Sequence, residues 1–367
     1  MKMSPLLLLL VQLLGVHLLV FQHVRLAGAV VKGGYSIGSA SNVNFQYVTH
    51  TYYAFTGVDP ASYQLVPDAG DTTIGTFVAT AKKSNPSVVT LVSIGGAAAP
   101  AATFAEMVST SSRRAVFINS SIALARQYGF EGLDLDWESP QTQGEMQNLA
   151  KLLKEWRAAT VTESQSSGKA KLLLTAAVSY QSILLYTGDM NQTWPIDAFN
   201  TYLDWANVMN YDYHGSWEPN ITGEHTALYD PNSTISTDYG ISNWLQAGLR
   251  PNKLCLGLAY YGKEWNLTSL DNVGVGAPAS GGGNPIIYSD IVAYNAGGAT
   301  VVYDATTVSM YSYKSSELTW IGYDNPDTIA AKVRYAKSRN LLGYFAWALQ
   351  HDTNTSSLAS AASNAWR

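Results

Sequence analysis

The sequence predicts an α/β protein whose main domain is a (β/α)8 TIM barrel, with a small α+β insertion domain between strands seven and eight. Two observations predict this fold: eight short β-branched or aromatic runs recur along the chain, and amphipathic helical stretches separate many of them. Alternating strands and helices form parallel sheets with right-handed crossovers, and eight such units indicate a closed barrel. An open α/β sheet is the alternative, but SIGG at 93–96 is too short for the Gly-rich phosphate-binding motif of such sheets.

The expected strands and helices can be placed by their apolar patterns. We expect strands at 30–36, 47–55, 88–94, 130–137, 172–179, 205–212, 253–261 and 342–349, and helices at 73–83, 113–128, 145–160, 242–248 and 327–339. Residues 266–325 differ in composition, because a Gly/Pro/Ala-rich loop precedes aromatic, β-rich pieces such as TVVYDATT. We therefore expect the barrel at 30–265 and 326–367, and the α+β insertion domain at 266–325.

The N-terminus is typical of a secretory signal. Lys2 supplies a positive start, residues 6–20 an apolar stretch, and Ala27-Gly28-Ala29 a small-residue cleavage pattern. A membrane anchor is the alternative, but this stretch is short for a span and contains polar residues. We expect residues 1–29 to be a signal peptide and the mature protein to be secreted, to the apoplast or the vacuole. Six glycosylation sequons agree with that route: Asn119, Asn191, Asn220, Asn232, Asn266 and Asn354.

Composition limits the partners. Without the signal the chain has 20 basic and 27 acidic side chains and no basic cluster, which argues against nucleic acid as a partner. Cys255 is the single cysteine, so no internal disulfide can form, and its apolar surroundings (LCLGLAYY) indicate a buried side chain rather than a nucleophile. We expect a monomer that needs no cofactor or metal and does not bind membranes.

Three carboxylates alternate with apolar residues in EGLDLDWESP (131–140): Asp134, Asp136 and Glu138. Successive side chains on a strand point to opposite faces, so these acids share one face. In a barrel that face is the interior, and the series ends at the C-terminal rim, where active sites lie. Crowding and burial raise pKa values, so at least one proton should be retained near neutral pH. Glu138 at the rim is the candidate general acid, Asp136 can share or pass its proton, and Asp134 supports them from below.

Two other interpretations of this acidic series are possible. A structural cluster of buried acids would need cationic partners, and the flanking strand contains no Lys or Arg. A divalent-metal site could be built from oxygen ligands, but no supporting His/Asp cluster is visible. We therefore favour catalysis.

DLDWE (134–138) closely resembles the signature of family 18 glycoside hydrolases, specifically the plant class V chitinases. SIGG (93–96), MNYDYHG (209–215) and GYFAW (343–347) are similar to the family's motifs on strands three, six and eight. The expected insertion also lies where the family has its α+β domain. The resemblance extends over essentially the whole mature chain, and the motifs together are highly specific.

The resemblance implies retaining hydrolysis of β-1,4 bonds in chitin, with the substrate's own N-acetyl group as the nucleophile. Glu138 would protonate the leaving oxygen, and Asp136 would turn to hold the acetamido N–H. Tyr211 would donate its hydroxyl to the acetamido carbonyl. Asp212 would hold the same sugar, and Trp347 would form the apolar floor beneath it.

Four further residues are candidates for substrate binding. Met209 is expected to line the cleft, Tyr53 and Phe55 to form part of its wall, and Trp217 to stack on a sugar beyond the cleavage point. Ordinary packing is the alternative for each of these residues.

The chain also departs from the family pattern. Glu131 replaces a common Asp at a position where little catalytic effect is expected, Ser139 replaces an aromatic residue, and strand one (GGYSIG) lacks a Trp. The two lost aromatic residues could weaken binding on one side of the cleft.

Three functions are therefore open. The first is an endo-acting chitinase, the second a non-catalytic chitin-binding lectin, and the third a hydrolase narrowed to lipo-chitooligosaccharide signals. Glu138 favours an enzyme over a lectin, because lectin-like relatives often lose it. Nothing in the sequence demands the third function.

Overall fold

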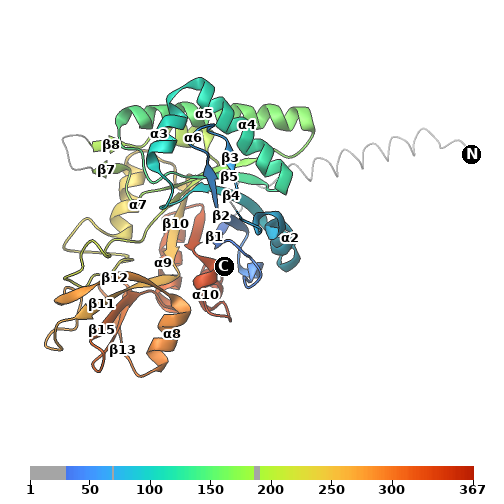
Figure 1. Cartoon of the computed structure of the whole chain (residues 1–367). Coiled ribbons are helices and arrows are strands. Elements are labelled where there is room, and N and C mark those ends of the chain that lie inside the picture. Colours follow the sequence, from blue (N-terminus) through green and yellow to red (C-terminus); the bar gives the residue numbers. More distant parts are fainter. Residues whose placement is uncertain (1–29, 68–69, 186–190) are drawn as a thin grey trace, which may run out of the picture.

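The computed structural model describes residues 30–67, 70–185 and 191–367, so the expected signal peptide lies outside the described residues. Eight parallel strands form one sheet, and the first strand pairs with both the second and the last, which closes a barrel (Figure 1). In order around the barrel they are β1 (Val31–Ile37), β2 (His50–Val58), β4 (Val89–Gly95), β5 (Gly132–Asp136), β6 (Leu173–Val178), β9 (Trp205–Val208), β10 (Leu254–Ala259) and β16 (Gly343–Trp347). The predicted TIM barrel is confirmed.

Helices surround this barrel. They are α2 (Ile74–Ser84), α3 (Ala101–Ser109), α4 (Ser111–Tyr128), α5 (Gln143–Ser167), α6 (Ile196–Tyr202), α7 (Thr237–Gln246), α9 (Pro326–Ser338) and α10 (Ser357–Ala365). Capping residues set their ends. The Thr142 side chain accepts the backbone N–H of Glu145 at 3.1 Å where α5 begins, and Gly168, with φ 69°, ends that helix. No helix in the described part of the chain has both the length and the apolarity needed to cross a membrane.

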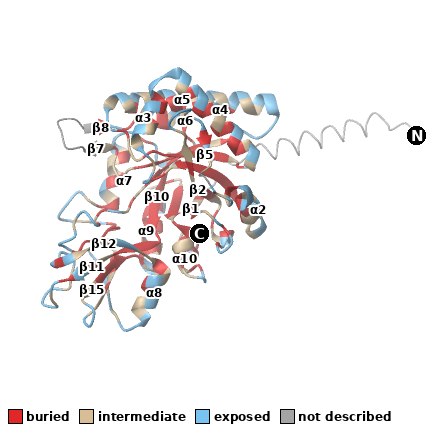
Figure 2. Ribbon diagram, viewed as in Figure 1, coloured by how far each residue is buried: buried red, intermediate tan, exposed pale blue. Residues whose placement is uncertain are grey.

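Buried residues line the barrel strands and the helix faces that pack on them (Figure 2). Their apolar side chains form two layers on the barrel wall. The outer layer packs the strands against the helices and contains residues such as Leu133, Leu135 and Trp156. The inner layer fills the barrel and contains Tyr35, Tyr52, Trp205, Cys255 and Phe345. Cys255 is fully buried there, as its sequence surroundings predict.

A separate antiparallel sheet stands beside the barrel, in the lower part of Figure 1. Its strands lie in the order β12 (Ala279–Ile287), β11 (Tyr261–Leu267), β15 (Thr319–Tyr323), β14 (Ser309–Lys314) and β13 (Thr300–Asp304), with α8 (Tyr288–Ala296) against it. This is the expected α+β insertion between the last two barrel strands. Its first strand begins at Tyr261, before the expected boundary at 266.

Several sequence boundaries need correction. The apolar run at 253–261 contains the end of one strand and the start of another, because β10 ends at Ala259 and β11 begins at Tyr261. The strand expected at 205–212 stops at Val208. Helices α3, α6, α8 and α10 were not expected. Short elements complete the described chain: β3 (Leu65–Val66), β7 (Ile183–Leu185), β8 (Asn191–Thr193), and the 3-10 turns Phe45–Tyr47, Pro251–Lys253 and Leu349–His351.

Candidate active site

The acidic series on β5 enters the barrel as its alternation predicts. Asp134 and Asp136 are 0% and 4% exposed, and Glu138 follows two residues after the strand ends. The intervening Leu135 and Trp137 belong to the outer layer, where Trp137 stacks on Phe104 with ring centroids 6.0 Å apart. The three carboxyl groups therefore rise along one inner face toward the C-terminal mouth.

Asp134 is held by neutral hydroxyl groups. Its carboxylate accepts hydrogen bonds from Tyr35 (2.8 Å), Ser93 (2.7 Å) and Thr175 (2.5 Å). Ser93 and Thr175 are its register neighbours on β4 and β6, so the sheet itself brings these donors to the acid. Burial raises the pKa of Asp134, and the three hydrogen bonds oppose that rise.

Tyr35 connects this acid to the layer below. Its ring stacks on Tyr52 with centroids 4.5 Å apart, and the Asn207 side-chain amide donates to its hydroxyl at 3.2 Å. Sequence reasoning missed Tyr35, Ser93 and Thr175 as supports. Strand alternation could have indicated Tyr35, because every second residue of its strand points into the barrel.

Asp136 is the middle acid of the series. Its Oδ1 is buried without a hydrogen-bond partner, and burial together with the charges of Glu138 and Asp134 raises its pKa well above the ordinary value. The neighbouring SIGG motif fits closely around its backbone, because a Cβ on Gly95 would lie 2.1 Å from the Asp136 carbonyl oxygen. Gly95 and Gly96 have φ values of 115° and 85°, which explains the glycine pair.

Glu138 is the acid at the mouth. Burial and the negative charge of Asp212 raise its pKa to about 6. The raised pKa of Glu138 agrees with its predicted role as the acid that gives a proton to the substrate. Asp136 is more deeply buried and lies between two other carboxyl groups, so its pKa is raised as well. The charge of Glu138 contributes to the raised pKa of Asp136, so ionisation of one acid opposes ionisation of the other.

Tyr211 and Asp212 lie in the segment after β9 rather than on the strand. Burial, followed by the charges of Asp136, Glu138, Asp212 and Asp134, raises the pKa of Tyr211 well above its ordinary value. The phenol therefore stays protonated and can donate a hydrogen bond. Tyr211 therefore lies in the same site as Asp134, Asp136 and Glu138.

Aromatic side chains form an apolar surface beside the acids. Trp347 stacks on Phe55 with centroids 5.5 Å apart and an interplanar angle of 21°, and its ring lies 5.6 Å from that of Tyr35. Both Trp347 and Phe55 are partly exposed. Met209 packs against the same inner cluster and is also partly exposed. Met209, Trp347 and Phe55 are thus placed where the sequence expected them.

Tyr53 lies elsewhere, which corrects its expected role in the cleft wall. It is 2% exposed in the outer layer, where its ring packs against Phe77 and its hydroxyl bonds to Asp71 and Thr73. Simple alternation would give Tyr53 and Phe55 the same face. The pairing of β2 with β4 shifts register between Tyr53 and Thr56, and this irregularity turns Phe55 into the barrel.

The insertion domain contributes residues that the sequence did not indicate. Lys263 on β11 lies 2.8 Å from the Asp212 carboxylate, and the Tyr261 hydroxyl bonds to the same carboxylate. Trp217 follows in the loop after β9, is 59% exposed, and has the Lys263 ammonium 5.9 Å from its ring. Trp217 is therefore open to a ligand next to Asp212.

Glu131 is confined to the opposite end of β5. Its carboxylate lies 2.7 Å from the Lys82 ammonium and accepts the backbone N–H of Thr90. This placement agrees with the small catalytic effect expected for the substitution at this position.

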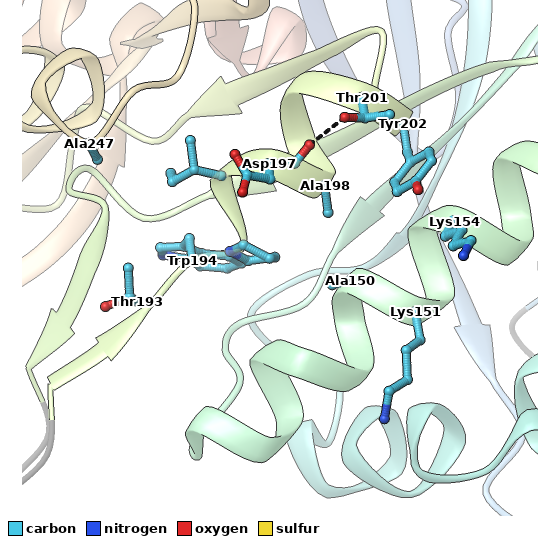
Figure 3. A pocket seen from close by; sticks show the side chains of 12 residues that line it. Ala150, Lys151, Lys154, Thr193, Trp194, Asp197, Ala198, Thr201, Tyr202 and Ala247 are labelled. Carbon is cyan, nitrogen blue, oxygen red and sulfur yellow. Dashed lines mark hydrogen bonds between the residues drawn. The ribbon is translucent and has the colours of Figure 1, made fainter.

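A groove of about 660 Å³ lies on the outer helical layer, between α5 and the segment that leads into α6 (Figure 3). Lys151, Lys154, Trp194 and Asp197 line it, and none of the predicted site residues does. Trp194 is 3% exposed and donates to Ser179 at 3.1 Å, so its ring mainly fills the outer core. Within the described ranges, no group of three or more His, Cys, Asp or Glu side chains is arranged to hold a metal ion.

Comparisons with known proteins agree with this geometry. A family model described as glycosyl hydrolases family 18 matches residues 31–352. The class V chitinase CHIT5 of Lotus japonicus is 44% identical over 333 residues, which cover 89% of this chain and 83% of that protein. Two solved structures are also similar across the chain. A mutant class V chitinase from Nicotiana tobaccum in complex with NAG4 has a TM-score of 0.87 at 40% identity, covering 92% of this chain and 99% of that one.

The second structure is a chitinase-like agglutinin, RobpsCRA from Robinia pseudoacacia. It has a TM-score of 0.84 at 41% identity and covers 92% of this chain and 100% of that one. The resemblance seen in the sequence motifs is confirmed: this chain belongs to family 18 of the glycosyl hydrolases, and its relatives include plant class V chitinases.

Proposed function

We propose that the protein is a secreted, endo-acting chitinase that cleaves β-1,4 bonds between N-acetylglucosamine units with retention. The observation that carries this proposal is the pair of protonatable acids at the barrel mouth. Asp136 is buried with an unpartnered oxygen, and Glu138 beside it has a pKa of about 6. The complex of a related class V chitinase with NAG4 supports a chitooligosaccharide as the ligand.

The chemistry follows from the roles that these groups can take. Glu138 donates its proton to the glycosidic oxygen, and the acetamido oxygen of the substrate attacks the anomeric carbon. The unpartnered oxygen of Asp136 accepts the acetamido N–H, and once Asp136 has given up its proton its carboxylate stabilises the developing positive charge. Tyr211 donates its hydroxyl to the acetamido carbonyl, while Trp347 supports the apolar face of the sugar. Water then attacks the anomeric carbon of the intermediate from the side that the leaving group occupied. Glu138 acts as the base that takes a proton from this water.

A chitin-binding lectin is the second candidate, because a chitinase-like agglutinin is as similar in sequence as the chitinases. The acid arrangement separates the two functions. A lectin needs the aromatic surface and Asp212 but has no use for a proton donor. The raised pKa of Glu138 therefore favours the enzyme.

The test is incubation with N-acetylglucosamine tetramers to hexamers, comparing the wild type with Glu138→Gln. The wild type should release β-anomeric products, and the variant should lose at least about a hundredfold in rate, the usual lower scale for general acid catalysis. Glu131→Gln is the matched control, because it makes the same change at the other end of β5, away from the mouth. Its activity should stay close to that of the wild type.

Two results would contradict this proposal. Binding of the oligomers without turnover by the wild type would assign the chain to the lectin function. Equal cleavage of fully deacetylated oligomers would exclude the acetamido group as the nucleophile.

Secretion is part of the proposal. The signal-like segment at 1–29 motivates it, and the exposed sequon asparagines Asn119, Asn220, Asn232, Asn266 and Asn354 support it, because a glycosylating enzyme could reach them. N-terminal sequencing of protein collected outside expressing plant cells should begin near Val30. Intracellular retention with Met1 intact would reject this part.

A further inference from the structure

The first strand of the insertion domain reaches into the barrel mouth. Strand β11 follows directly after barrel strand β10 and belongs to the sheet in the lower part of Figure 1. It carries Tyr261 and Lys263. Residues two apart on a strand share a face, so both side chains point the same way. They are 5% and 7% exposed. A lysine this buried needs a specific partner to balance its charge.

That partner is Asp212 of the barrel. The Lys263 ammonium lies 2.8 Å from the Asp212 Oδ1, and the Tyr261 hydroxyl donates to the same carboxylate. The buried His225 also approaches this carboxylate, with its Nδ1 3.8 Å away. Burial lowers the pKa of His225 to about 3, so its ring is neutral under ordinary conditions. Lys263 therefore supplies the positive charge at this contact.

The backbone of Asp212 explains why such support matters. Its φ of 59° is left-handed, a conformation that residues other than glycine adopt at a cost and that persists where the surroundings enforce it. The Asp212 side chain nevertheless remains 44% exposed. The carboxylate is thus held from the insertion side and open on the other side, which is the arrangement required to position a ligand.

Lys263 also lies near two aromatic rings of the mouth. Its ammonium is 5.5 Å from the ring centroid of Tyr261 and 5.9 Å from that of the exposed Trp217. Cation–π attraction adds to the ion pair and limits the positions that the ammonium can take. One side chain thereby connects Asp212 with the aromatic platform beyond it.

We propose that Lys263 is a positioning residue that the insertion domain contributes to the barrel site: it fixes the Asp212 carboxylate so that this group holds the sugar beside Glu138. The inference rests on the proposed function for its kinetic readout. Through the ion pair between Lys263 and Asp212, the insertion domain helps to position the substrate for the reaction.

The test is a double-mutant cycle on hydrolysis of the N-acetylglucosamine pentamer. Lys263→Met should lower kcat/KM by at least about tenfold, because it removes a charge-assisted contact to a residue that touches the sugar. Lys263→Arg should recover to within about threefold of the wild type, since its guanidinium can pair with the same carboxylate. Adding Lys263→Met to Asp212→Asn should cost less than about twofold further, because the lysine acts through Asp212.

Lys314→Met is the matched control. Lys314 lies in the same domain and pairs with the exposed Glu317, 3.4 Å away, so its removal should leave kcat/KM unchanged. Tyr261→Phe is the second variant and keeps the ring while removing the other donor to Asp212. It should lower kcat/KM in the wild-type background and have no effect beside Asp212→Asn, even if Lys263→Met fails to fold.

Binding measurements separate this inference from the proposed function. The same cycle can be run by calorimetry with the tetramer, in a Glu138→Gln background, and needs no turnover. A wild type that binds but does not hydrolyse would reject the proposed chitinase, while coupling of Lys263 to Asp212 in binding would still support the positioning role. The positioning role would be overturned if Lys263→Met had the kinetics and binding of the wild type. It would also be overturned if the loss in the double variant equalled the product of the losses in Lys263→Met and Asp212→Asn.

Discussion

Two regions of this molecule that contain buried acids balance the charge of these acids differently. In the barrel mouth, Asp134 is held by three hydroxyl groups and Asp136 has an unpartnered oxygen. No salt bridge in the described part of the chain involves Asp134, Asp136 or Glu138. Burial without a cationic partner raises the pKa of these acids, which favours their protonated forms.

The junction between β15 and α9 uses a lysine instead. Asp324 and Lys332 are 1% and 2% exposed, and their charged groups lie 2.6 Å apart. The same ammonium donates to the Thr226 carbonyl, so it links the loop after β9 to the insertion domain and to α9. Here the Lys332 ammonium balances the negative charge of Asp324. Unlike a proton, this cation cannot be transferred to a substrate.

The difference teaches how a buried carboxylate becomes either structural or reactive. A carboxylate paired with a buried cation stays ionised and holds elements together. A carboxylate surrounded by neutral donors and other acids keeps a proton and can transfer it. The same residue type therefore serves stability in one region and proton transfer in the other.

The largest effects are expected when one buried aspartate in each region is replaced by asparagine. Asp324→Asn should lower the free energy of unfolding by about 3–5 kcal/mol, because it leaves Lys332 buried and unpaired. Asp136→Asn should change the free energy of unfolding by less than about 1 kcal/mol, because the raised pKa of Asp136 favours the neutral acid, which an amide resembles in shape and charge. Its rate should nevertheless fall by about a hundredfold, because an amide cannot release a proton and become the anion that stabilises the positive charge developing on the acetamido group. Denaturant unfolding and hydrolysis of the tetramer measure the two effects.

Each variant is the control for the other. Folded Asp324→Asn protein should hydrolyse the tetramer at close to the wild-type rate. A strong loss of stability in Asp136→Asn, or a strong loss of rate in folded Asp324→Asn, would remove the distinction between the two regions.

A smaller effect is expected at Glu224, which lies near the Asp324–Lys332 pair. Glu224 is 4% exposed, and burial raises its pKa from 4.5 to about 7. Because its folded-state pKa lies above the unfolded value, its contribution to stability is full below pH 4.5 and is lost as the pH rises through about 7. Between pH 5 and 8, the wild type should therefore lose on the order of 2–3 kcal/mol relative to Glu224→Gln.

Thermal unfolding of both proteins across this pH range measures the difference. The comparison isolates Glu224, since Glu138 and Asp136 titrate in both proteins. Unfolding curves with the same pH dependence would show that Glu224 does not titrate in the folded protein in this range.

Much of the barrel could be predicted because its signals are local. Each barrel strand was found as a short apolar run, and the alternation on β5 placed Asp134, Asp136 and Glu138 correctly. Local signals also explain the errors. An apolar run does not show that the chain changes sheets at Tyr260, and alternation assigned Tyr53 to the cleft because it cannot detect the register shift after it.

The supporting residues of the site depend on contacts between distant segments. Tyr35 and Asp134 are 99 positions apart, so only the closed barrel brings them together. Lys263 falls within the range 30–265 that the sequence assigned to the barrel, but nothing there marks it as a site residue, because its ion pair with Asp212 depends on how the insertion domain packs on the barrel. Neither contact has a sequence spacing that would reveal it.

The central claim is that the mouth of the barrel keeps a proton on its acids and gives it to the substrate through Glu138. The pH dependence of kcat/KM for the acetylated tetramer tests it most directly, because this quantity reports the free enzyme. We expect kcat/KM to fall above an apparent pKa of about 6, when Glu138 loses its proton. A value of kcat/KM that stays constant from pH 5 to 8, or that rises across this range, would contradict the account.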